Sequence, residues 1–215
     1  MRVALIHAVP MAVAPVAAAF DALWPEAERI NLLDDSLSVD RQRAGALTPA
    51  IAARIAALAD YAKACGAEGI LYTCSAFGAA IEAVARASRI PVLKPNEAMF
   101  DEALTAGRRL GMLATFPPSV NGMEEEFRAQ AGAGGATLVT VCVPEAMAAA
   151  RRGDQASHDA LLAEAAGRPE LRDVDALMLA QLSMAPARDA VQSVARCRVL
   201  TSPESAVRKL KRLAS

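Results

Sequence analysis

A cysteine ends an apolar run in the stretch GILYTCSAFG, residues 69–78. The run predicts a buried strand, and the small and hydroxyl residues after Cys74 lead into a predicted helix. A thiol at such a strand end faces the unpaired backbone N–H groups of the helix, which can lower its pKa and supply thiolate. The same N–H groups, that of Ala76 included, can hold a carboxylate or an enolate together with the Ser75 hydroxyl.

Cys74 is either a reactive thiol or a small buried apolar residue, since free cysteines are among the most buried residue types. The position of Cys74 among the predicted strands and helices decides between the two. Short apolar runs alternate with longer helical patterns along the chain. The first half contains predicted strands at 2–8, 27–34, 69–74 and 90–95, and predicted helices at 13–23, 49–65, 80–88 and 96–106. The polar segment 34–45 is expected to be a loop that closes over the site as a lid.

The second half of the chain repeats the first. The segments that answer the four strands, in the same order, are 111–118, 136–143, 175–183 and 197–207. Pro118 aligns with Pro10 and Pro203 with Pro95, both at an offset of 108 (118 − 10 and 203 − 95). Such a repeat predicts an α/β fold made of two pseudo-symmetric, doubly wound, flavodoxin-like halves, each a parallel sheet with helices on both faces.

The repeat also pairs residues at the ends of the strands, beyond which the ligands of such sheets bind. His7 ends the first strand, and the offset makes Thr115 its counterpart. Cys74 ends the third strand, and 74 + 107 = 181 makes Gln181 its counterpart. If the two copies face each other, a central cleft should show a cysteine on one wall and a glutamine amide on the other.

Three segments carry a resemblance to a known family: LYTCSAFG, GMLATFPPSV and DVDALMLAQLSM. They resemble the aspartate/glutamate racemase superfamily, which includes hydantoin racemases, maleate isomerases and arylmalonate decarboxylases, and the resemblance covers essentially the whole chain. It implies two α/β halves around a central cleft, a small carboxylic acid as substrate, no cofactor and a homodimer. Because the family returns its last segment to the first half, the expected halves are 1–95 plus 203–215 and 96–202.

The third segment departs from the family where the second cysteine is expected, since Gln181 stands there. In a cofactor-independent racemase two thiols flank the α-carbon, and one removes a proton while the other supplies one. Glutamine has no usable pKa, so Cys74 is expected to act as a single catalytic thiol while Gln181 orients the substrate or stabilises charge. The default activity is isomerisation or racemisation. The alternatives are a one-cysteine decarboxylase of a malonate-type acid and a carboxylate-binding protein without turnover.

Several further residues are candidates for binding the substrate. His7 is either an acid or base of the site or a hydrogen-bonded strand-end residue. Thr115 and Ser119 either hold the substrate carboxylate or cap the helix that follows them. Asn96 either faces the cleft or caps a helix, and Ser183 completes the predicted set.

Composition argues against other classes of protein. The net charge of −1, without a basic stripe and interleaved aromatic residues, argues against nucleic-acid binding. No apolar stretch approaches the ~20 residues of a membrane span. The four cysteines share no CxxC or CxxH spacing, so no metal site is expected, and Cys65, Cys142 and Cys197 are interpreted as structural. No export signal is recognised, so reduced thiols in the cytoplasm are expected, and His158 is expected at the surface.

Overall fold

The computed structural model describes residues 1–214, which form two compact units. The first unit contains Met1–Ala98 and the segment that begins at Ala206, and the second contains Met99–Ser205. The units divide at 98/99 and 205/206, three residues after the expected boundaries at 95/96 and 202/203. Each unit is described below by itself.

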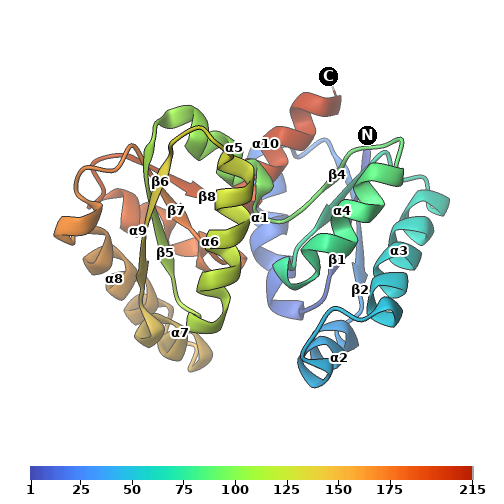
Figure 1. Cartoon of the computed structure of the whole chain (residues 1–215), viewed down its shortest axis with the longest axis horizontal. Helices are drawn as coiled ribbons and strands as arrows, with labels where there is room; N and C mark the ends of the chain where they lie inside the picture. Colours follow the sequence, from blue (N-terminus) through green and yellow to red (C-terminus); the bar gives the residue numbers. More distant parts are fainter. Residues whose placement is uncertain (215) are drawn as a thin grey trace. The chain divides into compact units, whose positions relative to one another are not determined.

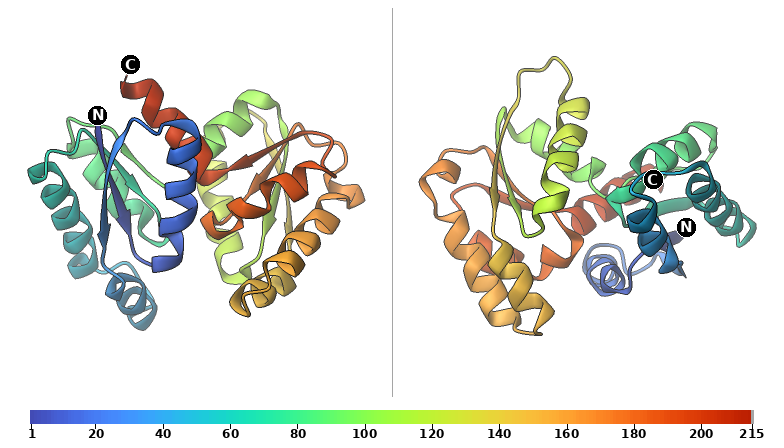
Figure 2. Two further views of the ribbon diagram at one scale, coloured as in Figure 1. Left: turned by 180° about the vertical axis from the view of Figure 1, so that it is seen from behind. Right: turned by 60° about the horizontal axis from the view of Figure 1, so that its bottom comes forward.

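The first unit is built on a sheet of four parallel strands in the order β2-β1-β3-β4. These strands are β1 (Arg2–His7), β2 (Glu28–Leu33), β3 (Gly69–Tyr72) and β4 (Val92–Leu93). The helices are η1 (Pro10–Ala12), α1 (Val13–Leu23), α2 (Ser36–Ala44), α3 (Pro49–Ala64), η2 (Ser75–Phe77) and α4 (Gly78–Ala87), while α5 (Glu97–Ala106) and α10 (Ser202–Ala214) run across the boundaries between the units. Because parallel strands need crossover connections, helices cover both faces: α3 and α4 lie on one face and α1 on the other (Figures 1 and 2).

The second unit repeats this plan with the strand order β6-β5-β7-β8, again all parallel. Its strands are β5 (Arg109–Ala114), β6 (Thr137–Cys142), β7 (Ala176–Leu179) and β8 (Arg198–Thr201). Its helices are α6 (Pro117–Ala131), α7 (Pro144–Arg151), α8 (Gln155–Ala166), η3 (Pro169–Leu171), η4 (Leu182–Ala187) and α9 (Arg188–Gln192). The helix α6 covers one face of the sheet, and α8 with α9 covers the other (Figures 1 and 2). The two parallel sheets and their flanking helices confirm the predicted α/β fold.

Strand register fixes which residues of the two units are equivalent. Val3 pairs with Gly69 in the first unit, and Leu110 pairs with Ala176 in the second, an offset of 107 on both strands (110 − 3 and 176 − 69). The same offset of 107 makes Cys74 equivalent to Gln181, as predicted.

The offset of 107 also corrects one predicted pair, because it makes His7 equivalent to Ala114. Thr115 is therefore the equivalent of Ala8, one residue beyond the strand, and not the counterpart of His7. The expected offset of 108 came from prolines outside the strands; at the offset of 107, Pro10 matches Pro117 instead of Pro118.

The prediction that the polar segment 34–45 is a loop is wrong, since residues 36–44 form helix α2. Its pattern has no helical stripe of apolar residues, and Leu37 is the only one of its side chains that is buried. The helix is fixed instead by charge, because Arg54 on α3 binds Asp34 and Asp40, both at 2.6 Å. Gly45, with a φ of 65°, ends the helix in the left-handed region that glycine adopts readily.

We expect replacement of Arg54 by Met to loosen α2 selectively, because both carboxylates lose their partner. The free energy of unfolding should fall by about 1 kcal/mol, as befits a small, half-exposed ion-pair network. Amide hydrogen exchange should accelerate in α2 more than in the strands. Arg43→Met is the matched control, because the Arg43 side chain is exposed and lies 3.8 Å from Asp40; equal effects of both variants would contradict this account.

Candidate active site

Cys74 follows β3 after one intervening residue, Thr73, and it is half-buried at the carboxyl end of the sheet. Burial raises the pKa of its thiol above the ordinary value, and a hydrogen bond from the Ala76 N–H opposes only part of that effect. The expected lowering of the pKa is therefore wrong. The reason is local: the short 3-10 turn η2 comes first and α4 begins only at Gly78, so the N–H groups of a long helix do not converge on the sulfur. At neutral pH Cys74 is a thiol, and hence a proton donor.

His7 ends β1 and is fully buried beside this strand end. Its Nδ1 lies 2.9 Å from Thr73 Oγ1, and its Nε2 lies 3.0 Å from Asn31 Oδ1. Burial lowers the pKa of the imidazole, which the bond to Asn31 only partly opposes. The geometry thus matches the hydrogen-bonded alternative for His7: a neutral ring that ties β1 to β2 and to the residue before Cys74. A direct role in substrate binding stays a prediction.

In the second unit the structure brings together three of the predicted site residues. The Gln181 amide oxygen accepts hydrogen bonds from the Thr115 N–H at 2.9 Å and from the Thr115 hydroxyl at 3.2 Å. The amide nitrogen of Gln181 donates to Ser119 Oγ at 3.0 Å. Thr115 is buried and Gln181 is half-buried, so this cluster forms an ordered end to β5 and β7.

The orientation of the Gln181 amide follows from its partners. A backbone N–H can only donate, so the oxygen must face Thr115. The Ser119 hydroxyl donates its hydrogen to the Phe116 carbonyl at 2.8 Å, so it can only accept from the amide nitrogen. One N–H of the amide is then left without a partner in this cluster. Gln181 therefore presents a neutral donor with a fixed direction at the position where Cys74 stands in the first unit.

The alternative interpretation of Thr115 and Ser119, as caps of the following helix, is wrong. The helix α6 begins at Pro117, and its N-cap residue Phe116 makes no side-chain capping bond. Because Pro117 and Pro118 have no N–H, this helix start offers few donors to an anion. The Thr115 N–H and hydroxyl converge on one point, which the oxygen of Gln181 fills.

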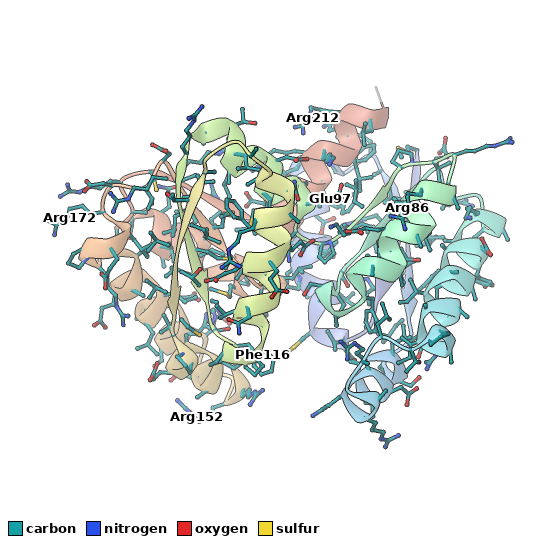
Figure 3. The ribbon with its side chains drawn as sticks, in the orientation of Figure 1. Arg86, Glu97, Phe116, Arg152, Arg172 and Arg212 are labelled. Atoms are coloured by element: carbon teal, nitrogen blue, oxygen red, sulfur yellow. The ribbon has the colours of Figure 1, made fainter. Side chains whose placement is uncertain are left out.

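The remaining predicted residues lie on the turns and at the helix start that follow β3, β7 and β4. Ser75 and Ala76 are exposed on η2, and Ser183 is half-buried on η4. Asn96 is buried directly before α5. Glu97, labelled in Figure 3, accepts from the Lys94 N–H at 3.1 Å and pairs with Lys209 at 2.8 Å, so it serves the helix start and α10.

The prediction that His158 lies at the surface is wrong. It is buried, with 2% of its surface exposed, and its Nδ1 lies 2.7 Å from Asp159 Oδ1. The missed signal was the helical stripe in α8, since His158 shares one buried face with Leu162, Ala165 and Ala166 at spacings of i+4, i+7 and i+8.

The family model described as Asp/Glu/Hydantoin racemase matches residues 12–211, nearly the whole chain. The chain belongs to the Asp/Glu/hydantoin racemase family. Membership supports the expectation of an isomerase enzyme. No curated protein sequence matches the chain.

Solved structures share the fold at low sequence identity. Allantoin racemase from Klebsiella pneumoniae has a TM-score of 0.72 at 13% identity, covering 100% of this chain and 87% of its own. An aspartate racemase homologue from Pyrococcus horikoshii has a TM-score of 0.74 at 16% identity, covering 99% and 98%. Glutamate racemase RacE1 from Bacillus anthracis has a TM-score of 0.71 at 15% identity, covering 98% and 80%. At such identities these likenesses show the fold of the family.

No helix within residues 1–214 is long and apolar enough to cross a membrane. Within the same residues, no three His, Cys, Asp or Glu side chains gather in a way that could hold a metal ion.

We expect the thiol of Cys74 to be alkylated by iodoacetamide more slowly at pH 7 than a free cysteine. Its raised pKa leaves less thiolate, so the pH midpoint of the reaction should lie above the ordinary cysteine value. The measurement uses a variant with serine at the other three cysteines, and Cys74→Ser in that background gives the blank. A midpoint below the ordinary value would contradict the account of burial.

Gln181→Ala should lower the free energy of unfolding by about 1–3 kcal/mol, because the buried Thr115 N–H loses its acceptor. Gln181→Glu keeps an acceptor at the same distance and should cost less. Urea denaturation of both variants measures the difference. Equal losses would show that the hydrogen bonds of the amide oxygen contribute little to stability.

Proposed function

We propose that the chain is a cofactor-independent enzyme that acts at the α-carbon of a small carboxylic acid, with Cys74 as its reacting thiol. Membership of the racemase family supports the reaction class. The position of Cys74 supports the residue, because ligands of parallel α/β sheets bind beyond the carboxyl ends of the strands. The single observation that carries the proposal is the equivalence by register of Cys74 and Gln181 within this family. One copy of the repeat holds a thiol there and the other an amide.

In this proposal Gln181 binds and orients the acid. Its amide oxygen accepts hydrogen bonds from Thr115, and one of its amide N–H groups donates to Ser119. The second N–H is a neutral donor suited to a carboxylate or an enolate oxygen. Ser75 and Ala76, exposed on η2 beside Cys74, are proposed to bind the acid, with the Ser75 hydroxyl as the donor.

Isomerisation or racemisation is the proposed default activity. It requires removal of the α-proton, and the electron pair stays on carbon as an enolate that hydrogen bonds stabilise. A proton then returns to the carbon from a thiol. Cys74 can carry out one of these two transfers, and the Gln181 amide can carry out neither.

Decarboxylation of a malonate-type acid is the second candidate, and the raised pKa of Cys74 favours it. Loss of carbon dioxide leaves the electron pair on the α-carbon without any base. The Cys74 thiol then donates its proton to that carbon, and the thiolate recovers a proton from water. A buried, protonated thiol is already in the form that this step needs.

A dimeric assembly and a cytoplasmic location stay predictions.

The experiment that tests the proposal measures three outcomes in D₂O: exchange of the α-hydrogen of aspartate and glutamate, racemisation of each, and carbon dioxide release from phenylmalonate. Cys74→Ser should lower the rate of whichever reaction the wild type performs by about 100-fold or more, as loss of an acid–base group does. Cys197→Ser is the matched control. Saturable binding without turnover, unchanged in Cys74→Ser, would contradict the proposal and indicate a carboxylate-binding protein that is not an enzyme.

Gln181→Cys should restore a second thiol at the equivalent position and raise racemisation relative to exchange. The physical reason is that proton transfer then becomes available at both equivalent strand ends. Gln181→Ser is the control, because it removes the amide without adding a thiol. Chiral chromatography of the recovered acid measures the ratio, and an identical ratio in both variants would argue against the pairing of residues 74 and 181.

A further inference from the structure

The surface of the second unit carries a groove between the helices α7 and α8. The two helices form an antiparallel hairpin, since the turn that joins them is short, residues 152–154. Gly153 allows this turn with a φ of 76°. The helices pack along each other, as Figures 1 and 2 show, and the groove between them has a volume of about 550 Å³. All residues that line it come from this hairpin, so the groove is a feature of the second unit alone.

The lining residues follow the same spacing on both helices. Each helix contributes positions i, i+3, i+4 and i+7, which share one helical face. These positions are Glu145, Ala148, Ala149 and Arg152 at α7, and Ser157, Ala160, Leu161 and Glu164 on α8. The middle of the groove is therefore made of small and apolar side chains. Because the helices are antiparallel, Glu145 and Glu164 stand at one end, and Arg152 stands with Ser157 at the other.

The charged side chains at the two ends are not neutralised by neighbours. Glu145, Glu164 and Arg152 are exposed, and within residues 1–214 none of their side chains forms a salt bridge or a hydrogen bond. Figure 3 shows Arg152 extending outward from the hairpin. The groove is thus acidic at one end, basic at the other and apolar between them. A partner that fits it must offer the same three features in the opposite order.

We propose that a second copy of this chain occupies the groove, so that α7 and α8 form the interface of an isologous dimer. A two-fold axis that crosses both helices at their middle turns the acidic end of one copy to the basic end of the other. Glu145 then faces Arg152 of the partner subunit, and Glu164 faces Ser157 of the partner subunit. The spacing permits both pairs at once, because 152 − 145 and 164 − 157 are both 7. This inference goes beyond the proposed function and does not depend on it.

The charges also choose between two possible orientations of the axis. An axis parallel to the helices would place α7 against α8 of the other copy and would bring Glu145 against Glu164. Like charges in contact are unfavourable, so this orientation is rejected. The axis that crosses the helices places each helix antiparallel to its own copy. The exposed side chains of Ala148 and Ala160 are small, which allows the helices of the two copies to approach closely.

The size of the hairpin indicates a weak dimer. The helices have 8 and 12 residues and are therefore about 12 and 18 Å long. Their exposed face is smaller than the ~800 Å² that each partner buries in a typical stable complex. The net charge of −1 causes little general repulsion between copies. We expect a dimer that dissociates on dilution and at high salt, because salt screens the exposed charge pairs.

Sedimentation analysis of the full chain over a range of concentrations tests the proposal. Arg152→Glu and Glu145→Arg should each raise the dissociation constant of the dimer about tenfold or more, because each places like charges together twice. An equimolar mixture of these two variants should dimerise like the wild type, since both contacts of the mixed dimer again join opposite charges. Arg151→Glu is the matched control, because Arg151 is exposed on α7 and does not line the groove. A monomer at every concentration would leave the groove to a different protein and overturn the proposal, as would equal dissociation constants for Arg152→Glu and Arg151→Glu.

Disulfide crosslinking tests the orientation of the two copies. In a background with serine at the four native cysteines, Ala148→Cys should give covalent dimers on oxidation, because residue 148 lies beside the proposed axis. Ala53→Cys, at an exposed alanine of α3, is the control and should stay monomeric. If Ala148→Cys crosslinked only when mixed with Ala160→Cys chains, α7 would face α8 of the other copy. That result would overturn the proposed pairing of charges.

Discussion

The whole site depends on one constraint, that all strands of each sheet are parallel. Each strand must be followed by a connection that returns the chain to the other edge, so the carboxyl ends of four strands gather at a single edge. Residues that are distant in sequence meet there, as Thr115 and Gln181 do across 66 positions. An antiparallel sheet would send alternate strand ends to opposite edges and separate these partners. The chemistry proposed for this chain is therefore a property of topology before it is a property of any residue.

The amide of Gln181 illustrates how equivalent positions of two repeated units can hold different chemistry. A thiol at this position would make weak hydrogen bonds, whereas the amide satisfies a buried backbone donor and a hydroxyl at once. Glutamine at this position has no titratable proton and forms a hydrogen-bonded corner with Thr115 and Ser119. The two edges are equivalent in backbone register and different in chemistry, which is the situation expected when each copy serves a separate task.

The sequence was sufficient for the fold and for the pairing of Cys74 with Gln181, because both follow from strand periodicity and a constant offset. It was insufficient where tertiary charge decides. Helix α2 has no apolar stripe, and the Arg54 ion pairs that fix it join residues 14 and 20 positions apart. The direction of the pKa shift of Cys74 was also misjudged, since burial of the thiol outweighs the hydrogen bond from the Ala76 N–H, and burial cannot be derived from the sequence pattern around the strand end. Pattern predicted the elements, but not the lengths of the turns that join them.

The two histidines show how the copies diverged around a common frame. Each lies buried near the carboxyl end of its own sheet, yet they do not occupy equivalent positions, since His7 matches Ala114 on the register. His7 has donors or acceptors at both ring nitrogens and therefore behaves as a structural crosslink between strands. His158 is tied at one nitrogen only, through a carboxylate on its own helix. His158 shares the buried face of α8 with Leu162 and Ala165. One ring therefore joins neighbouring strands, and the other belongs to the packing of a helix, so the two histidines serve different elements of the repeated plan.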